Sequence, residues 1–440
     1  MRYLRQVLAM MREEKLYSAM YICGTALAIA FTMLIAEVYY VKTANIAPEV
    51  NRSKTYYLSR LDNRNWKEDS NDSVPVVVEI TQEMFRNMFL KMKTPECVMA
   101  EFPRWGLGDF YIKLADGKHD RSVVIELTEP NYFRFFQFHF TEGAPFTQDD
   151  FDNERRIVVI TEEIREQLFG KGEKGVGKTV RVENRDYRIC GVVETPSVLT
   201  EKCCADIWFP YSADSLLIDR GKNYHTQGLE LSFCVASNKF DAFKQEMREV
   251  EARYNAVHKE TNLDMLQRLD SYYNGVWNNI SGVFNKYSYE KSWYWYMVVA
   301  IFMLLFVPAL NLSGMVVSRM ERRLPEMAIR KAFGAKRRTL LGQVIMENLT
   351  LTIIGGFIGL FLAWLALYAW RSWVFYMFFS PFQGYDFYGR VPIIEGEMLF
   401  APAIFLICLL ICCVLNLLAA ALPAWLSLRK PIVESMMEKK

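Results

Sequence analysis

The sequence predicts an α-helical membrane protein with four transmembrane helices, plus a large α+β extracytoplasmic domain inserted between helices 1 and 2. Hydrophobic residues make up 52 % of the 440 residues, and aromatic residues make up 14 %. Charged residues are unevenly distributed, and a long segment of mixed composition separates the first charge-free stretch from three others. The four charge-free stretches, each of at least 19 residues, are Ser18–Ala36, Trp293–Ser318, Asn348–Trp370 and Met398–Leu428.

The length of these stretches and the hydrogen-bonding requirement of the backbone predict that they are transmembrane helices. About 20 helical residues cross the hydrocarbon core of a bilayer, and a backbone in lipid must satisfy its own hydrogen bonds. A helix in the core of a soluble protein rarely lacks charge on every side. The first stretch exceeds the apolar core of about 7–15 residues that a cleavable signal peptide has, so we expect it to remain as a span. The predicted spans are residues 18–41, 293–318, 340–370 and 398–428.

Lys and Arg set the orientation. They are concentrated in the amphipathic N-terminal segment 1–17, the loop 319–339 and the tail 429–440, whereas the short loop 371–397 has only two. Cytoplasmic loops carry the excess of positive charge. We therefore expect both termini in the cytoplasm of a bacterial cell, a multi-pass protein of the inner membrane, and residues 42–292 outside.

Strand and helix patterns alternate through residues 42–292 and indicate an α+β domain. Residues 155–170 are typical of a strand followed by a helix that Gly170 ends, and residues 178–194 of two strands around Asn184. The other predicted elements are a strand at 55–61, a helix at 80–92, two strands around Asp116–Gly117, and a strand followed by a helix at 229–254.

One loop of this domain has the spacing of a nucleotide-binding P-loop, with Gly172, Gly177, Lys178 and Thr179 in the matching places. A working P-loop has a strand before it and a helix after it, because the helix N-terminus faces the phosphates. Here a helix precedes the glycines and a strand follows. We therefore interpret the loop as a helix-to-strand connection and expect no cofactor to bind the chain.

Five of the nine cysteines lie in residues 42–292: Cys97, Cys190, Cys203, Cys204 and Cys234. The odd number excludes complete pairing within one chain, and the adjacent Cys203 and Cys204 are poorly placed to bridge each other. Their disulfide state stays open. No spacing resembles a zinc site, and no nucleophile–base or paired-carboxylate pattern is found, so we expect neither a metal nor a catalytic residue.

The basic loop between the second and third spans contains signals for a short helix over residues 325–333. Pro325 suits the first helical turn, where Glu326 also complements the helix dipole. Arg330 and Lys331 fall in the last turn, and Gly334 suits the left-handed position that follows a helix. A solvated basic loop that only fixes topology is the alternative.

The stretch "EMAIRKAFGAKRRTLLGQVIMENLTLTIIGGFIGL" at 326–360 resembles the signature of the FtsX-like permease domain of MacB-like (type VII) ABC transporters. The exported segments "EPNYFRFFQFHFTEGAPFT" and "RIVVITEEIREQLFGKGEKGVGKTVRVENRDYRICGVVE" are similar to the extracytoplasmic domain of that family. The order of parts, one span followed by a large outer domain and three spans, is also the family's. Ala328, where the family often has Gly, and Pro325 depart from its pattern.

The resemblance implies a permease subunit without catalytic activity, in which ATP is bound and hydrolysed by a separate cytoplasmic ABC ATPase. The helix 325–333 would be the coupling helix that enters a groove of that ATPase, and three glycines would allow close helix packing in the third span. The implied coupling residues are Pro325, Glu326, Met327, Ile329, Arg330, Lys331, Phe333 and Gly334, and the packing residues are Gly355, Gly356 and Gly359.

The same resemblance implies a second permease subunit in a homodimer or heterodimer, and an extracytoplasmic adaptor or target protein as a further partner. We expect the segment 1–17 to lie on membrane lipid, and no nucleic acid among the partners. Three functions fit this architecture: efflux of a substrate from the outer side, release of lipoproteins, and action on an outer partner. A signalling receptor with an extracytoplasmic sensor domain is the alternative from another class, and a membrane enzyme has the least support.

Overall fold

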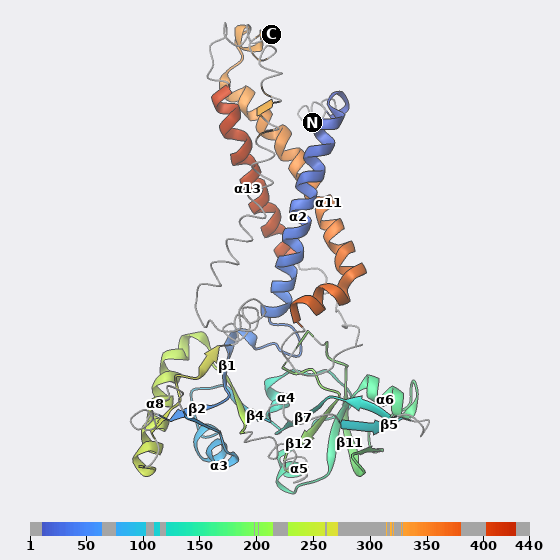
Figure 1. The fold of residues 1–440 in the computed structure, drawn as a ribbon, viewed down its shortest axis with the longest axis vertical. Coiled ribbons are helices and arrows are strands. Elements are labelled where there is room, and N and C mark those ends of the chain that lie inside the picture. The colour runs from blue at the N-terminus through green and yellow to red at the C-terminus, as the bar shows by residue number, and fades with distance from the viewer. Residues whose placement is uncertain are drawn as a thin grey trace. The chain divides into compact units, whose positions relative to one another are not determined.

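In the computed structural model the chain folds into two compact units (Figure 1). The first comprises Met1–Tyr40, Ser288–Phe378 and Ile394–Lys440, and the second comprises Val41–Tyr287 and Phe379–Ile393. Each is described here by itself. The structure describes residues 11–63, 76–102, 110–114, 120–197, 199–200, 202–213, 228–259, 262–271, 314, 317–318, 320, 327, 329–379 and 402–427.

Three helices among the described residues are long and apolar enough to cross a membrane. Apart from residues 41–43 and 379 at two of their ends, they belong to the first unit. They are α2 (Lys15–Thr43), α11 (Arg337–Phe379) and α13 (Pro402–Ser427). The helical geometry of α11 is interrupted at Trp370, where φ is −115° and ψ is 19°. Of the predicted span 293–318, only residues 314, 317 and 318 are described, so the four-helix count lies outside what the structure describes.

The second unit is built on a mixed twelve-stranded sheet and a three-stranded sheet. The order in the large sheet is β15-β1-β13-β4-β7-β12-β9-β11-β10-β5-β6, and β8 pairs with β11. Its strands are β1 (Thr55–Leu58), β4 (Cys97–Glu101), β5 (Phe110–Lys113), β6 (Asp120–Val123), β7 (Ile125–Thr128), β8 (Phe140–Gly143), β9 (Ile157–Thr161), β10 (Thr179–Val182), β11 (Arg185–Val193), β12 (Ile207–Pro210), β13 (Glu230–Cys234) and β15 (Leu269–Ser271). The small sheet has the order β14-β2-β3, with β2 (Leu61–Asn63), β3 (Val76–Val78) and β14 (Leu263–Asp264).

Two hydrophobic clusters cover the two faces of the large sheet. Successive side chains of a strand point to opposite faces, and accordingly Val158 of β9 belongs to one cluster while its neighbour Val159 belongs to the other. The first cluster also receives side chains from α5 (Gln148–Asp152), α6 (Glu162–Phe169) and α8 (Phe240–Val257), and the second receives them from α4 (Tyr132–Phe135). Helices on both faces explain why all five residues of β9 are buried.

The predictions for residues 155–194 and 229–254 are confirmed. The strand β9 is followed by α6, and Gly170 ends that helix with a φ of 97°. The antiparallel pair β10 and β11 turns through Glu183 and Asn184, both with positive φ, which is the backbone that a tight hairpin requires. Strand β13 precedes α8, as predicted.

The predicted helix 80–92 differs in shape from the structure. Thr81 caps its start by accepting a hydrogen bond from the Met84 N–H, and α3 spans only Gln82–Met84. The chain then widens into a π-helical turn at Phe85–Phe89, from which both terminal phenylalanines are buried in the core. Core packing of these two rings has overridden the regular helical period.

Candidate coupling site

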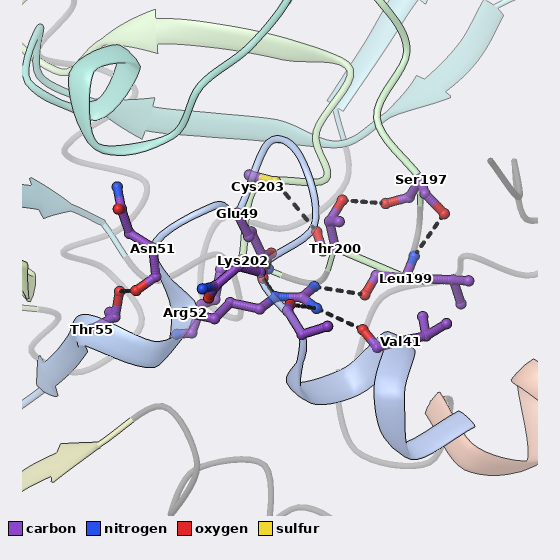
Figure 2. A network of polar contacts seen from close by, with 12 residues as sticks. Val41, Glu49, Asn51, Arg52, Thr55, Ser197, Leu199, Thr200, Lys202 and Cys203 are labelled. Carbon is purple, nitrogen blue, oxygen red and sulfur yellow. Dashed lines mark hydrogen bonds and ion pairs between the residues drawn. The ribbon is translucent and has the colours of Figure 1, made fainter. Parts of the chain in front are cut away.

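The end of helix α2 is held by Arg52, which lies at the start of the 3-10 turn η1 (Arg52–Lys54). The last four carbonyl groups of any helix lack partners within the helix. Residues 44–51 reverse the chain, so the Arg52 side chain reaches back to the last turn of α2 (Figure 2). A cation at a helix C-terminus is also favoured by the helix dipole. Arg52 therefore acts as a side-chain cap for α2.

The guanidinium of Arg52 donates in several directions at once (Figure 2). Its Nη1 donates to the carbonyls of Val41 at 2.6 Å and Ala44 at 3.0 Å, and its Nη2 donates to the Leu199 carbonyl at 3.4 Å. The Nε donates to Oε2 of Glu49 at 2.6 Å. Arg52 is only 2 % exposed, so these hydrogen bonds replace those that the guanidinium makes to water when it is exposed.

Glu49 connects Arg52 to a third segment. It is 2 % exposed, and its Oε1 accepts a hydrogen bond from the backbone N–H of Lys202 at 2.8 Å. The Lys202 ammonium lies 3.5 Å from the Glu230 carboxylate and 4.8 Å from the centre of the Tyr57 ring. Charged groups are rarely buried unless they are paired and hydrogen-bonded, and here both members of the pair are. We call Val41, Glu49, Arg52, Leu199 and Lys202 the Arg52 clamp.

Neighbouring hydrogen bonds fix both sides of the clamp. Thr200 Oγ1 donates to the Ser197 carbonyl at 2.7 Å, which shapes the turn that presents Leu199. On the other side, Asn51 Nδ2 donates to the Phe135 carbonyl at 3.0 Å, and the Gln137 N–H donates to the Pro48 carbonyl at 2.9 Å. The last turn of α2 is thus joined to segments that lie far away in the sequence. Such an arrangement holds backbone segments together and has no reacting group.

Nothing in the sequence singled out Arg52 or Glu49. The pair has the common i, i+3 spacing of opposite charges, which on a surface contributes little. The one available signal is its place directly after the first predicted span. What makes the pair important is burial under Leu199 and Lys202, which are about 150 residues away in the chain.

The loop that resembles a P-loop carries an internal anion. Helix α6 precedes it and β10 follows it, which is the predicted reverse order. Oε2 of Glu142 accepts hydrogen bonds from the N–H groups of Gly175 at 2.9 Å and Val176 at 3.3 Å. Burial alone would raise the pKa of Glu142, but these bonds and the Arg165 guanidinium together lower it. The Glu142 carboxylate therefore accepts from two backbone N–H groups of the glycine-rich loop.

The described part of the predicted coupling helix ends as expected. Gly334 has a φ of 90° and its N–H donates to the Lys331 carbonyl, while the Ala335 N–H donates to the Arg330 carbonyl. These two bonds are the Schellman pattern, in which a left-handed glycine satisfies the last carbonyls of a helix. Pro325 and Glu326 lie outside the described residues, so the start of the helix is not described.

Side chains of this helix divide between two surroundings. Ile329 is 47 % exposed and Phe333 is 89 % exposed. Met327 instead packs against the hydrophobic cluster that contains Tyr21 and Leu340, so its side chain contacts the other helices of the first unit, which we call the membrane unit. The large apolar side chains of Ile329 and Phe333 are therefore exposed on the described part of the helix.

A polar chain connects the helix with α11. Arg330 Nη1 donates to Gln343 Oε1 at 3.3 Å, and Gln343 Nε2 donates to Glu347 Oε1 at 3.2 Å. Glu347 is 4 % exposed. Further along, Thr352 Oγ1 lies 3.2 Å from the Tyr21 hydroxyl and accepts from Asn416 Nδ2 at 3.3 Å, which links three helices. Hydrogen bonds of this kind join helices in membranes.

Gly355, Gly356 and Gly359 lie at the closest approaches of α11 to its neighbours. A Cβ on Gly359 would come within 2.6 Å of the Ala26 carbonyl oxygen in α2, and one on Gly355 within 3.0 Å of Thr25. A Cβ on Gly356 would meet Leu409 of α13 at 2.4 Å. The end of the Leu409 side chain can move away from an added Cβ, but the Ala26 carbonyl is backbone, so glycine is required for this packing at Gly359.

Comparison with known proteins now adds the family. The model of the MacB-like periplasmic core domain matches residues 18–250, and the model of the FtsX-like permease C-terminal domain matches residues 298–432. Family members of this kind are permease components of ABC transporters that work with ATPase partners.

Two curated relatives are similar to part of the chain. The pyoverdine export ATP-binding/permease protein PvdT of Pseudomonas syringae pv. syringae is 23 % identical over 56 % of this chain and 36 % of its own length. The macrolide export ATP-binding/permease protein MacB of Photorhabdus laumondii is 24 % identical over 59 % of this chain and 39 % of its own length. The alignments therefore span little more than a third of each relative.

Among solved structures, the periplasmic region of MacB from Actinobacillus actinomycetemcomitans is 13 % identical, with a TM-score of 0.35, over 50 % of this chain and 90 % of that chain. The extracellular domain of YknZ from Gram-positive bacteria is 15 % identical, with a TM-score of 0.33, over 49 % and 98 %. The first family model alone spans more than half of the 440 residues, and the second covers most of the remainder, so this chain belongs to the MacB/FtsX-like family of ABC transporter permeases.

Proposed function

We propose that the chain is a non-catalytic permease subunit that transmits ATP-driven motion from a separate cytoplasmic ABC ATPase to residues 42–292. That motion expels a substrate from the outer side of the membrane or acts on an extracytoplasmic partner. The observation that supports this most directly is the Arg52 clamp, because it fixes the last turn of α2 to the domain by buried, charged hydrogen bonds.

The input of the motion is the helix 325–333. Ile329 and Phe333, exposed at 47 % and 89 %, insert into a groove of the ATPase, while Met327 seats the helix on the membrane unit. Large exposed apolar side chains of this kind serve as anchors in protein interfaces. Arg330 and Lys331 add ion pairs at the rim, and Arg330 passes displacement to α11 through Gln343.

Displacement of α11 reaches α2 through the glycine contacts. Gly355 and Gly359 bring the two backbones so close that neither helix slides independently of the other. Helix α2 continues without a break to Thr43, where the Arg52 clamp holds it. A connected series of stiff elements of this kind can carry coupling between distant sites.

The remaining placement follows the distribution of charge. The chain lies in the bacterial inner membrane with both termini in the cytoplasm, and it works as a homodimer or heterodimer with a second permease subunit. Segment 1–17 rests on membrane lipid, and an outer adaptor or target protein receives the motion. The relatives PvdT and MacB are export proteins for pyoverdine and for macrolides, which supports efflux over the release of lipoproteins.

Co-purification tests the input. Tagged full-length protein is isolated in detergent, and the ATPase subunit bound to it is quantified for Phe333→Asp, Ile329→Asp and Phe333→Leu. The aspartate variants are expected to lose the ATPase, since a charge cannot enter an apolar groove, and Phe333→Leu is expected to retain it. Equal retention by Phe333→Asp and the parent, with normal membrane insertion, would remove the coupling role from this helix.

Hydrogen exchange tests the output. The complex is trapped with ATP and vanadate, and exchange is followed in the peptides that cover residues 41–55 and 199–213. Nucleotide trapping is expected to change exchange there in the parent and in Arg181→Met, which alters an exposed ion pair with Asp186. In Arg52→Met the ATPase stays bound but the nucleotide-dependent change disappears. A change of unaltered size in Arg52→Met would show that motion reaches the domain by another route.

A further inference from the structure

Two of the cysteines that the sequence left unassigned face each other across neighbouring strands. In the antiparallel pair β4 and β13, Cys97 lies directly opposite Cys234. Residues opposed in an antiparallel pair have Cα atoms about 4.5–5.5 Å apart, and a disulfide needs Cα atoms about 4.4–6.8 Å apart. Backbone pairing therefore already supplies the separation that a disulfide requires.

Both side chains also lie on the same face of the sheet. Cys234 is part of the cluster formed with Trp208 and Tyr132, and Cys97 packs against that same cluster. At present Cys97 Sγ lies 4.0 Å from the Val98 carbonyl, and Cys234 Sγ lies 3.8 Å from a carboxylate oxygen of Glu96. Neither contact is strong, so each thiol can rotate about its Cα–Cβ bond toward the other without losing a good hydrogen bond.

We propose that Cys97 and Cys234 are a cross-strand dithiol that a disulfide-bearing oxidant, such as an oxidised thiol oxidoreductase or glutathione disulfide, closes into an intramolecular disulfide. The half-buried Cys97 thiolate attacks the oxidant and releases one thiol. The Cys234 thiolate then attacks the mixed disulfide and releases the second thiol. Two electrons and two protons pass from the cysteine pair to the oxidant, which leaves as two thiols.

The bond would lie beside the Arg52 clamp. Thr55 of β1, Cys234 of β13 and Cys97 of β4 form one row across three strands, and Thr55 follows directly after η1, which begins with Arg52. The Lys54 carbonyl accepts from the Val235 N–H at 2.8 Å, so the same row is also hydrogen-bonded next to the clamp. Closure would fix β4 to β13 at the place where the domain holds α2.

The other outer cysteines offer matched controls. Cys190 is also half-buried and packs against the same cluster, but its Sγ lies 3.2 Å from the Val158 carbonyl on β9 and no cysteine is opposite it among the described strand pairs. Cys203 is fully buried and follows the turn at Thr200. Position in the register, and not burial alone, distinguishes the proposed pair.

Closure is tested on the purified full-length protein. It is incubated with glutathione disulfide, free thiols are alkylated, and unreduced peptides are mapped by mass spectrometry. We expect a peptide that joins Cys97 to Cys234 and is lighter by two hydrogen atoms than its separate halves. It should be absent from Cys97→Ser and present in Cys190→Ser. Alkylation of both thiols in the parent, or a bond from Cys97 to Cys190 or Cys203 instead, would overturn the proposal.

A second measurement follows the rate against pH. Burial raises the pKa of both thiols to about 11, so the thiolate fraction rises about tenfold per pH unit below that value, and closure should accelerate to match between pH 7 and 9. That an oxidant meets this cysteine pair in the cell rests on the proposed location of the domain outside the membrane; the strand geometry does not. Alkylation of the protein at lysis reports the state of the pair in the cell. A pair that is reduced at lysis but forms the disulfide with glutathione disulfide in vitro would support the pairing and count only against the proposed location.

Discussion

Replacing Arg52 with Met removes the central donor of the Arg52 clamp while keeping an unbranched apolar side chain. The parent residue is 2 % exposed, and the variant leaves Glu49, also 2 % exposed, as a buried carboxylate without its cation. It also takes donors from the carbonyls of Val41, Ala44 and Leu199. Removal of one partner from a buried ion pair costs about 3–5 kcal/mol. We expect the free energy of unfolding of the domain to fall by that amount.

The assay is proteolysis of the full-length protein in detergent after equilibration in increasing urea, which reports the fraction of unfolded domain. Arg181→Met is the matched control, because Arg181 makes a two-pronged ion pair with Asp186 on the surface of the same domain. Exposed pairs of this kind contribute little, so its unfolding midpoint should match the parent. Glu49→Met combined with Arg52→Met should recover part of the loss, because no carboxylate stays buried without its cation. The Lys202 N–H and the three carbonyls would still lack these hydrogen bonds, so the recovery is incomplete.

Two results would refute this reasoning. Equal midpoints for Arg52→Met and Arg181→Met would mean that water or a rearranged backbone replaces the lost donors, so that the clamp holds nothing. A double variant that is less stable than Arg52→Met would mean that the buried Glu49 carboxylate is satisfied without Arg52. In either case α2 would not be fastened to the domain in the way that the proposed transmission of motion requires.

Two further predictions concern packing and pH. Gly359→Ala should destabilise the membrane unit by about 1–3 kcal/mol, because the added methyl group meets the Ala26 carbonyl at 2.6 Å. Gly342→Ala, in the same helix with nothing within 4 Å, should be neutral or stabilising when thermal unfolding in detergent is compared. Burial raises the pKa of Glu129 from 4.5 to about 7, against the Asn131 N–H that lowers it. Because the pKa of Glu129 is higher in the folded protein than in the unfolded chain, protonation of Glu129 stabilises the fold by about 3 kcal/mol. This contribution is complete below pH 4.5 and is lost as the pH rises through 7. The glutamine of Glu129→Gln is neutral at every pH, so the unfolding midpoint in urea should depend less on pH in this variant than in the parent. An equal pH dependence in both would show that other groups cause it.

Local chemistry explains what the sequence predicted well. Charge-free length predicts a membrane helix without any knowledge of its neighbours, and α2, α11 and α13 lie where three of the four stretches are. The cap at Gly334 and the hairpin at Asn184 depend on residues only a few positions apart. The order of elements around Gly172 and Gly177, with a helix before and a strand after, is equally local and could be predicted before the fold was known.

The sequence by itself thus determined which segments suit lipid, several strands, helices and hairpins of the domain, and which family the chain resembles. Tertiary structure alone decided that Arg52 and Glu49 cap α2, that Glu142 fills the glycine-rich loop, that Met327 faces the membrane unit, and that Cys97 lies opposite Cys234. These contacts depend on strand register and burial. Register pairs residues more than a hundred positions apart, and burial makes the loss of either partner of an ion pair costly, so neither effect can be predicted from any short stretch of sequence.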